Sequence, residues 1–523
     1  MLKIMCWALA FASVVLLTCA QSDLFRDDLR NQAGQEEWIK LQQQVQQERQ
    51  AANPQVAYKI DAAELQPAAA PTQQLPVNLA ISDDIAEHVL SFAQSLTKQL
   101  NQEYAKTTIF SPLSIANAMA LLQLGAKGRS YAELSQVFGQ ADNVQFHEQF
   151  ALMQHDVQQR FNDTTSPQRQ LDQWHWQSLR KALRAYPRNL HAPVNIDVAN
   201  GMFVQQGFYL NDDYVRAAQQ LYKAKLELLD FNRQPAVAKR TINAWVSEHT
   251  KGKIREIISD VPEDTRVILA NALYFKAVWE IDFIKGATKP EMFYPNGLDT
   301  QPEVPVDMMV GVGVFPYYED EQLNCRILGL PYHGHLATMY VIQPLLESSI
   351  ERLANLQQTL SAANIQQMIS KMTRRSIIVA FPKLDLTESF SLRNHLTEMG
   401  IGGMFTPIQS DLSLIGGRHA PNASTGGNSL FNLEQQRQAA KASQAPTPPS
   451  DLIVSDILHK VNFVVNEQGT EAAAATAAVL KKSGPELTFR AETPFMLLVR
   501  HDVTKLPLFY GIINEPPRSR QQH

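Results

Sequence analysis

The sequence predicts a large α+β domain, and three observations support this fold class. The chain has 523 residues, of which 45% are hydrophobic, so it is long enough to bury a sizeable core. Apolar residues recur at helical spacing in several segments, and short strand-like runs lie between them. The two kinds of segment do not alternate strictly, which favours an α+β arrangement over a doubly wound parallel sheet.

Residues 1–20 are predicted to be a secretory signal peptide. Lys3 supplies a positive charge, residues 7–17 form a short apolar run, and residues 18–20 resemble a cleavage site. The alternative is a membrane anchor, for which the apolar run is too short. No second apolar stretch of spanning length follows, so we expect a secreted, extracellular protein with no membrane segment.

Residues 21–80 are rich in Gln and Ala and contain only three aromatic residues. Such a segment cannot bury enough apolar surface to form a core, so we predict a disordered extension. A cleavable pro-segment is the alternative. The compact domain is expected over residues 81–516, and residues 517–523 form a short tail.

Within this domain the apolar spacing predicts several helices and strands. Helices are expected from about residue 82 and over residues 112–124, 146–158, 212–221, 236–250 and 392–399. Strands are expected over residues 194–204, 265–274, 337–344, 376–381, 460–465 and 495–499. Residues 416–450 are rich in Gly, Ser, Asn, Gln and Pro, and are predicted to form a disordered low-complexity insertion.

Cysteines and glycosylation motifs agree with the secreted location. Cys6 and Cys19 lie in the predicted signal, so Cys325 alone remains and no intramolecular disulfide can form. Asn162 and Asn422 each begin a triplet that accepts N-linked glycans in secreted proteins.

Catalytic and metal-binding motifs are missing from the sequence. It contains no nucleophile elbow, P-loop or zinc-protease motif. His333 and His335 would need a third metal ligand that the sequence does not place, and Cys325 has no activating partner nearby in the sequence. The net charge of −5 gives no general attraction to nucleic acid. We therefore expect a protein that is not an enzyme, binds no metal and needs no cofactor.

The most informative segment is the Ala-rich stretch that begins near Glu467. An Ala-rich helix is one interpretation, because Ala is the best helix former. However, the segment has no amphipathic face and lies between strand-like runs. Every second residue is uncharged, as a strand with one face passing into a protein interior requires; these residues are Thr470, Ala472, Ala474, Thr476, Ala478 and Leu480.

At this point a resemblance to a known family emerges from motifs spread over most of the domain. The chain resembles the serpins over residues 81–415 and 451–516. The motifs occur in the family's order: residues 110–115 with 124–128, 199–204, 242–246 with 250–254, 271–276 with Trp279, 381–383, 459–460, the Ala-rich segment and 507–511. Ala277 stands where the family usually has Gly.

The resemblance implies a fold of three β-sheets and about eight to nine helices, with an exposed reactive-centre loop in residues 467–493. It also implies a suicide-substrate mechanism, in which the cleaved loop inserts into a sheet and carries the trapped protease with it. The loop hinge would comprise Glu467, Gly469, Thr470, Glu471, Ala472, Ala473, Ala474, Ala475 and Thr476. The residues beneath the opening sheet and at the point of loop insertion would be Ser111, Ser114, Asn271, Trp279 and His459.

The reactive bond has two candidate positions. The usual family register places it between Ser483 and Gly484. Lys482 directly precedes Ser483, and the anionic pocket of a trypsin-like protease suits a long cation. We therefore favour the bond between Lys482 and Ser483.

The resemblance also suggests a partner and a setting. The N-terminal extension, the insertion and the two lysines of the loop resemble those of secreted arthropod haemolymph serpins. We therefore expect a monomer that inhibits a trypsin-like extracellular serine protease of the clip-domain type. The protease would belong to a cascade of immunity, melanisation or development. Arg180, Lys181 and Arg184 could bind a glycosaminoglycan activator, although a solvated basic linker explains them better. A non-inhibitory carrier or chaperone of the same fold, or a secreted interaction protein, is the alternative function.

Overall fold

The computed structural model describes residues of the unit Gln74–His523, which are 77–101, 106–139, 143–158, 171–175, 195–298, 300–334, 336–345, 348–419, 427–442, 451–470 and 485–519. The following description concerns this unit alone.

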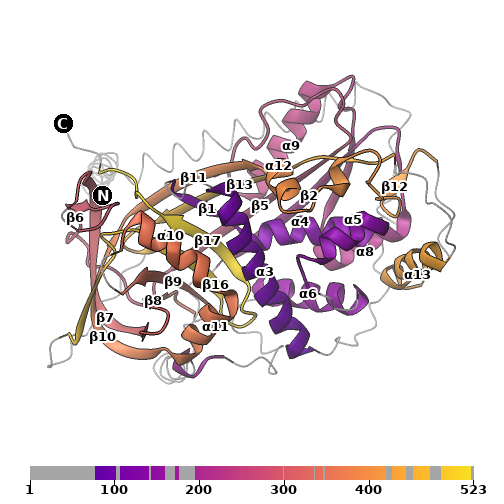
Figure 1. Ribbon diagram of the computed structural model, residues 1–523. Helices are drawn as coiled ribbons and strands as arrows, with labels where there is room; N and C mark the ends of the chain where they lie inside the picture. The colour runs from indigo at the N-terminus through magenta and orange to yellow at the C-terminus, as the bar shows by residue number, and fades with distance from the viewer. Residues whose placement is uncertain are drawn as a thin grey trace, which may run out of the picture. The chain divides into compact units, whose positions relative to one another are not determined.

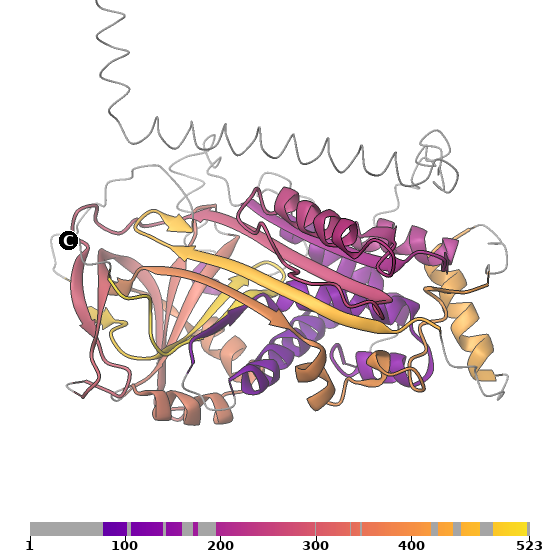
Figure 2. The ribbon, with the colours of Figure 1, turned by 90° about the horizontal axis from the view of Figure 1, so that it is seen from above.

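A six-stranded sheet provides the scaffold of the candidate site. Its order is β11-β13-β5-β2-β4, and the short β14 pairs with β5 in addition. The strands are β2 (Asn195–Gln205), β4 (Lys225–Leu229), β5 (Val267–Val278), β11 (Leu384–Ser391), β13 (Val454–Val465) and β14 (Gly469–Thr470). Nearly every residue of β5 is buried, since α4 and α9 cover its two faces, so β5 is almost continuously apolar. Figure 2 shows α9 lying along the strands.

The second sheet has nine strands in the order β1-β17-β16-β9-β8-β7-β10-β15, with β6 paired to β7. Every residue of β16 and β17 is buried. β1 pairs with β17, which joins segments about 400 residues apart in the chain. The strands are β1 (Thr108–Phe110), β6 (Lys289–Phe293), β7 (Val304–Asp320), β8 (Cys325–Pro331), β9 (Ala337–Pro344), β10 (Thr373–Pro382), β15 (Leu487–Arg490), β16 (Phe495–His501) and β17 (Pro507–Ile513).

A third, two-stranded sheet joins β3 (Tyr209–Leu210) to β12 (Gly416–Gly417). The helices are placed around the sheets, as Figure 1 shows. They are α3 (Leu79–Leu100), α4 (Pro112–Gly125), α5 (Gly128–Ser135), α6 (Asn143–Gln158), α8 (Asp212–Tyr222), α9 (Pro235–His249), α10 (Ile350–Thr359), α11 (Ala362–Lys371), α12 (Arg393–Glu398), η1 (Gly403–Phe405) and α13 (Ser429–Ala442).

Helix α4 is central to the core, and its sequence explains where it starts. The Ser111 side chain accepts a hydrogen bond from the backbone N–H of Ser114, and Pro112 occupies the first turn, where it needs no hydrogen-bond donor. All 14 residues of α4 are buried. A helix buried on every side carries no amphipathic pattern, so its apolar composition, and not its periodicity, marks it as core.

The predicted α+β class and the three sheets are confirmed. The described residues form ten α-helices and one 3-10 helix, slightly more than the expected eight to nine. Expected helices and strands agree with α4, α6, α8, α9, α12, β2, β5, β9, β10, β13 and β16 to within a few residues at most ends. The 17-residue strand β7 and helices α10 and α11 were not predicted.

The prediction of disorder over residues 416–450 is wrong for its described part. Residues 429–442 form the helix α13, in which Leu430, Leu433 and Arg437 are buried, and residues 416–417 form β12. The Gln-rich composition did not reveal this helix, because only a few of its side chains are buried against the rest of the unit.

Several sequence predictions lie outside the described residues. These are the signal peptide, most of the extension to residue 80, His335, Asn162, Asn422, the basic residues Arg180, Lys181 and Arg184, and residues 471–484 of the loop. In the part of the chain that the structure describes, no helix has both the length and the apolar character needed to cross a bilayer.

The close packing of α4 on α8 and β12 yields a first prediction. A Cβ atom on Gly125 would lie 2.2 Å from Cγ1 of Ile415 and 2.9 Å from Cε2 of Tyr214, and both residues are fully buried. We expect Gly125→Ala to destabilise the fold by about 1–3 kcal/mol because the core is overpacked. The midpoint of thermal unfolding measures this loss. Gly417→Ala is the control, since a Cβ on Gly417 meets no atom within 4 Å. Equal midpoints for the two variants would contradict the prediction.

Candidate functional site

The six-stranded sheet is incompletely paired between its two longest strands. β13 runs parallel to β5, and their pairing extends from Val454 beside Val267 to Lys460 beside Ala272. Both strands continue beyond this point, β5 to Val278 and β13 to Val465. The sheet therefore contains a gap, open at one end, between two strands that each pair with another neighbour on the far side.

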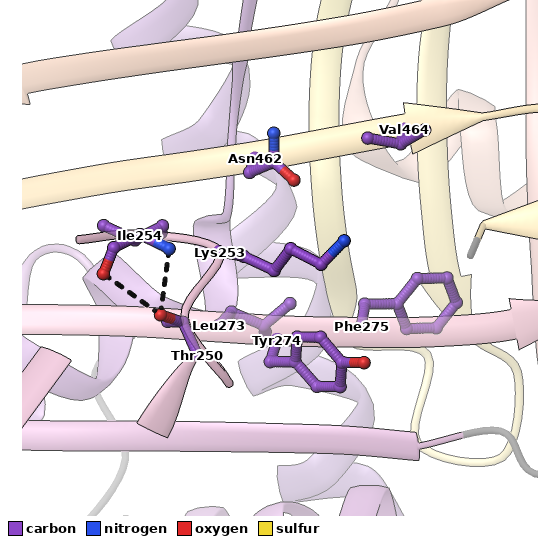
Figure 3. A pocket seen from close by; sticks show the side chains of 8 residues that line it. All are labelled: Thr250, Lys253, Ile254, Leu273, Tyr274, Phe275, Asn462 and Val464. Carbon is purple, nitrogen blue, oxygen red and sulfur yellow. Dashed lines mark hydrogen bonds between the residues drawn. The ribbon is translucent and has the colours of Figure 1, made fainter. Parts of the chain in front are cut away.

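A small pocket marks this gap, and Figure 3 shows it from close by. Leu273, Tyr274 and Phe275 of β5 form one wall, and Asn462 and Val464 of β13 form the other. The segment that follows α9 covers the pocket, with the Lys253 side chain lying between the two strands in Figure 3. It also lines the pocket with Thr250 and Ile254.

The covering segment is held by its own hydrogen bonds. The Thr250 hydroxyl donates to the carbonyl oxygens of Val246 at 2.8 Å and Ile254 at 3.3 Å, and accepts from the Ile254 N–H at 3.1 Å. Lys251 places its ammonium group 4.4 Å from the centre of the Tyr274 ring, and Lys460 donates to the Glu256 carbonyl at 2.8 Å. The cover is thus fastened to both walls of the gap.

The start of the predicted loop lies in the open end of the gap. After β13 the chain turns at Asn466, and β14 pairs antiparallel with β5, Gly469 beside Val278 and Thr470 beside Ala277. Gly469 has a φ of +142°, and a Cβ there would lie 2.1 Å from the Ala277 carbonyl oxygen. Only glycine fits this close approach. The first loop residues thus already lie beside β5 as the beginning of a strand.

Trp279, at the end of β5, holds this turn in place. Its backbone N–H donates to the Gln468 carbonyl at 3.1 Å, and its indole Nε1 donates to the Asn466 carbonyl at 2.9 Å. The indole ring stacks on Tyr332 with ring centres 4.5 Å apart. Trp279 therefore lies beside the turn that precedes β14, and its expected role at the point of loop insertion stays a prediction.

Glu467 anchors the same turn through its side chain. Lys383 forms an ion pair with Glu467 at 2.7 Å, and the Thr288 hydroxyl donates to the same carboxylate at 2.6 Å. Partial burial opposes ionisation, but the hydrogen bonds from Lys383 and Thr288 outweigh it and lower the pKa of Glu467. Sequence reasoning named Glu467 but not its partners, since charge pairs between distant segments leave no local pattern.

A buried polar cluster lies where β5 and β13 begin to separate. His459 and Asn271 are neighbours across the two strands, and Asn271 faces Asn200 of β2. The Ser111 backbone N–H donates to Nε2 of His459 at 3.0 Å, and the Asn271 amide donates to Oδ1 of Asn200 at 2.8 Å. The structure therefore brings Ser111, Ser114, Asn271 and His459 together at this point, while their expected role beneath an opening sheet stays a prediction.

Three groups of this cluster have unused hydrogen-bonding capacity. Nδ1 of His459, Oδ1 of Asn271 and Oγ of Ser114 are buried and have no hydrogen-bond partner among the described residues. Because Nε2 of His459 accepts a hydrogen bond, the ring is neutral and carries its proton on Nδ1. Burial lowers the pKa of His459 to about 3.

The other candidate side chains are not arranged for chemistry. Cys325 is buried in β8, where burial and the nearby Asp320 raise its pKa to about 12, so its thiol is not a nucleophile. Among the described residues no group of three or more His, Cys, Asp or Glu side chains is placed to bind a metal ion.

Comparisons with known proteins agree with this architecture. The family described as "Serpin (serine protease inhibitor)" matches residues 87–516. Serine protease inhibitor 28Dc of Drosophila melanogaster is 47% identical over 542 residues, which cover 98% of this chain and 99% of that protein. Leukocyte elastase inhibitor of Equus caballus is 30% identical, over 81% of this chain and 97% of its own length.

A solved structure of thyroxine-binding globulin in complex with thyroxine has the same fold, with a TM-score of 0.61 and 22% identity. The match covers 83% of this chain and 99% of that one. The family match over residues 87–516 and the 47% identity to the Drosophila inhibitor show that this chain belongs to the serpin family.

The neutral, buried state of His459 predicts a pH dependence of stability. Below pH 6.5, the ordinary value, the unfolded chain takes up a proton at this position, whereas the folded chain does so only near pH 3. The free energy of unfolding should therefore fall as the pH drops from 6.5 towards 3, by up to about 1.4 kcal/mol per pH unit. Urea unfolding between pH 5 and pH 7.5 measures this slope.

His459→Gln is the matched variant, because its side chain can still accept the Ser111 hydrogen bond but does not titrate. Burial also lowers the pKa of His147, so this residue contributes a slope of the same sign to both proteins. The difference between the two slopes reports His459. Identical slopes would show that His459 is not the titrating group.

Proposed function

We propose that this chain is a secreted inhibitory serpin, which traps trypsin-like serine proteases by inserting its cleaved loop into the gap between β5 and β13. The position of β14 is the observation that carries this proposal. Gly469 and Thr470 already pair with β5 at the open end of the gap, so continued pairing would extend the loop as an added strand.

The sequence of the loop suits this insertion. An inserted strand buries one face against the core, and an unpaired charge on that face would be very costly. The face that continues from Thr470 carries Ala472, Ala474, Thr476 and Ala478, which are small and uncharged. An inhibitor gains from such a face, whereas a carrier or chaperone has no need of it.

We place the reactive bond between Lys482 and Ser483, with the bond between Ser483 and Gly484 as the alternative. A lysine before the bond matches the anionic pocket of trypsin-like proteases. Once acylated, the protease would be carried with the inserting loop while its active site is distorted. The chain performs no catalysis of its own in this scheme and needs no cofactor. A glycosaminoglycan bound at Arg180, Lys181 and Arg184 would act only as an accelerator.

The extracellular setting rests on the sequence. A signal-like segment precedes the domain, and Asn162 and Asn422 are glycan acceptors, which favours a secreted monomer that restrains an extracellular protease cascade. We place the target among trypsin-like, clip-domain proteases of immunity, melanisation or development. A secreted interaction protein that acts through residues 21–80 and 416–450 is the alternative from another class, and it would function without an intact loop.

The direct test is to mix the purified protein with trypsin and to examine the products on denaturing gels and by mass spectrometry. We expect a covalent complex and a released peptide that begins at Ser483. Lys482→Ala should lower the rate of inhibition of trypsin by about 100-fold or more, because the cation that fills the pocket is lost. Lys481→Ala is the control and should change the rate much less. Complete cleavage without a complex would contradict the inhibitory function.

A second prediction concerns the alternating face of the loop. Ala474→Arg places a charge on the face that must be buried, so insertion should stall and the variant should be cleaved as a substrate without trapping trypsin. Ala473→Arg places the same charge on the opposite face and should still form the complex. The ratio of complex to cleaved protein measures the difference. The same ratio in both variants would rule out insertion with this register.

A further inference from the structure

The chain beyond the predicted reactive bond is attached to the edge of the nine-stranded sheet. The Glu486 N–H donates to the Ser376 carbonyl of β10 at 2.8 Å. β15 then runs parallel to β10, starting with Leu487 beside Ile377. The residues just after the loop therefore have a fixed position on β10, which pairs with β7 on its other side (Figure 1).

A surface hollow of about 800 Å³ lies beside this attachment. Asp320, at the end of β7, shapes the turn at its rim, because its Oδ1 atom accepts from the N–H groups of Gln322 at 3.1 Å and Leu323 at 3.0 Å. The name acidic hollow denotes the surface lined by residues 317–322 of β7 and this turn, by Lys371, Thr373 and Arg375 around the start of β10, and by Glu486 and Leu487.

Carboxylates outnumber cations in the acidic hollow. Arg375 pairs with Glu486 at 3.6 Å, and both side chains are more than half exposed. Among the residues that the structure describes, the other three carboxylates form no ion pair, so they are available to a cationic partner. These carboxylates belong to Glu319, Asp320 and Glu321, and Lys371 is the second cation of the hollow.

Two tyrosines add aromatic surface to the same hollow. Tyr317 and Tyr318 line it, and the Lys371 ammonium group lies 5.8 Å from the centre of the Tyr318 ring. The faces of aromatic rings attract ammonium and guanidinium groups, and carboxylates pair with them. An anionic partner would instead add repulsion. The hollow therefore fits a protein surface that presents Lys or Arg side chains.

The predicted reactive bond lies within a short length of chain from the acidic hollow. Glu486 is four positions after Lys482. Because an extended chain spans at most about 3.6 Å per residue, covalent geometry keeps Lys482 within about 14 Å of Glu486. A protease domain of about 220 residues has a radius of gyration of about 17 Å. A protease that holds Lys482 in its specificity pocket must therefore also face the hollow.

We propose that the acidic hollow is a second contact surface for the target protease, and that it binds Lys and Arg side chains beside the protease active site. The inference rests on the inhibitory function proposed above and adds a determinant of specificity outside the reactive bond. Complementary charges attract the partner during approach and fix its orientation on docking. Among proteases with the same specificity pocket, those with a basic surface at this place would be preferred.

The experiment uses two trypsins that share the specificity pocket and differ in net charge, one cationic and one anionic. In both, the catalytic serine is replaced by alanine, so no acyl-enzyme forms and binding to the full chain is reversible. We expect Glu321→Lys to weaken binding of the cationic trypsin about fivefold to tenfold at low salt. The loss should shrink below about twofold at about 300 mM salt, because salt screens exposed charges. The anionic trypsin should bind the variant at least as tightly as the wild type.

Glu263→Lys is the matched control. Glu263 is exposed, as Glu321 is, and lies in the turn before β5, at the end of that strand opposite to β14. This variant changes the net charge equally and should alter the affinity by less than about twofold. Both variants should unfold at the wild-type midpoint, because both side chains are exposed.

Three outcomes would overturn the proposal. Equal losses in the two variants would show an effect of net charge alone, and an unchanged affinity in Glu321→Lys would show that the hollow does not contact the protease. Tighter binding of the cationic trypsin by Glu321→Lys would show that the carboxylates hold the chain's own Lys481 and Lys482 instead.

Binding of inactive trypsin involves no trapping, so the two proposals fail separately. If the wild type shows the expected loss in Glu321→Lys but active trypsin cleaves it without forming a complex, the inhibitory function is refuted and the contact surface stands. If active trypsin is trapped and Glu321→Lys binds as the wild type does, the contact surface alone is refuted. Wild-type protein that does not bind the inactive cationic trypsin would also refute the contact surface.

Discussion

The unfinished pairing of β5 and β13 is the constraint on which the rest of the structure depends. Hydrogen bonding between the strands ends at Ala272 and Lys460, and both strands run on with one edge unpaired. An unpaired strand edge attracts another strand, and here two such edges face each other inside one sheet. The neighbouring segments partly fill this gap. The Thr250–Ile254 segment covers it, and β14 pairs with β5 at its open end. Trp279 and Glu467 hold the turn that leads into β14. The site is therefore an unpaired stretch between two strands that has room for a further strand, and it is not a pocket for a small molecule.

The polar cluster around His459, at the closed end of this gap, lowers the stability of the folded state. A buried donor or acceptor without a partner costs about 1–3 kcal/mol, and the cluster contains three such atoms among the described residues. The present arrangement of strands bears that cost, while a shifted arrangement could pair the same atoms and recover it.

Much of this could be predicted from the sequence, but unevenly. Ser111, Asn271, Trp279 and His459, which lie around the gap, were named from the sequence because they belong to ordered local motifs. The hinge face beyond Thr470 lies outside the described residues and stays a prediction. Lys383 and Thr288, which hold Glu467, were not identified as site residues, because contacts between distant segments have no signature in a single sequence. Helix α13 was mistaken for disorder for a related reason. Arg437 of this helix bonds to the end of α4, more than 300 residues away in the chain. The composition of a segment cannot predict such a contact. Strand β7 was missed because its exposure alternates only in part, so it lacks a clear period of two.

The position of β16 and β17 in the chain has a consequence for biosynthesis. Both strands follow the predicted reactive-centre loop in the sequence, yet they lie inside the nine-stranded sheet, where β17 pairs with β1 and β16 pairs with β9. That sheet cannot close until the ribosome has made the loop and the strands beyond it. Contacts over such separations form slowly, so the nascent chain must wait with exposed apolar edges. If residues 471–484 insert as proposed, the gap between β5 and β13 and the strand that fills it would both exist during that interval, and folding in cells would require the second sheet to be completed before the loop inserts.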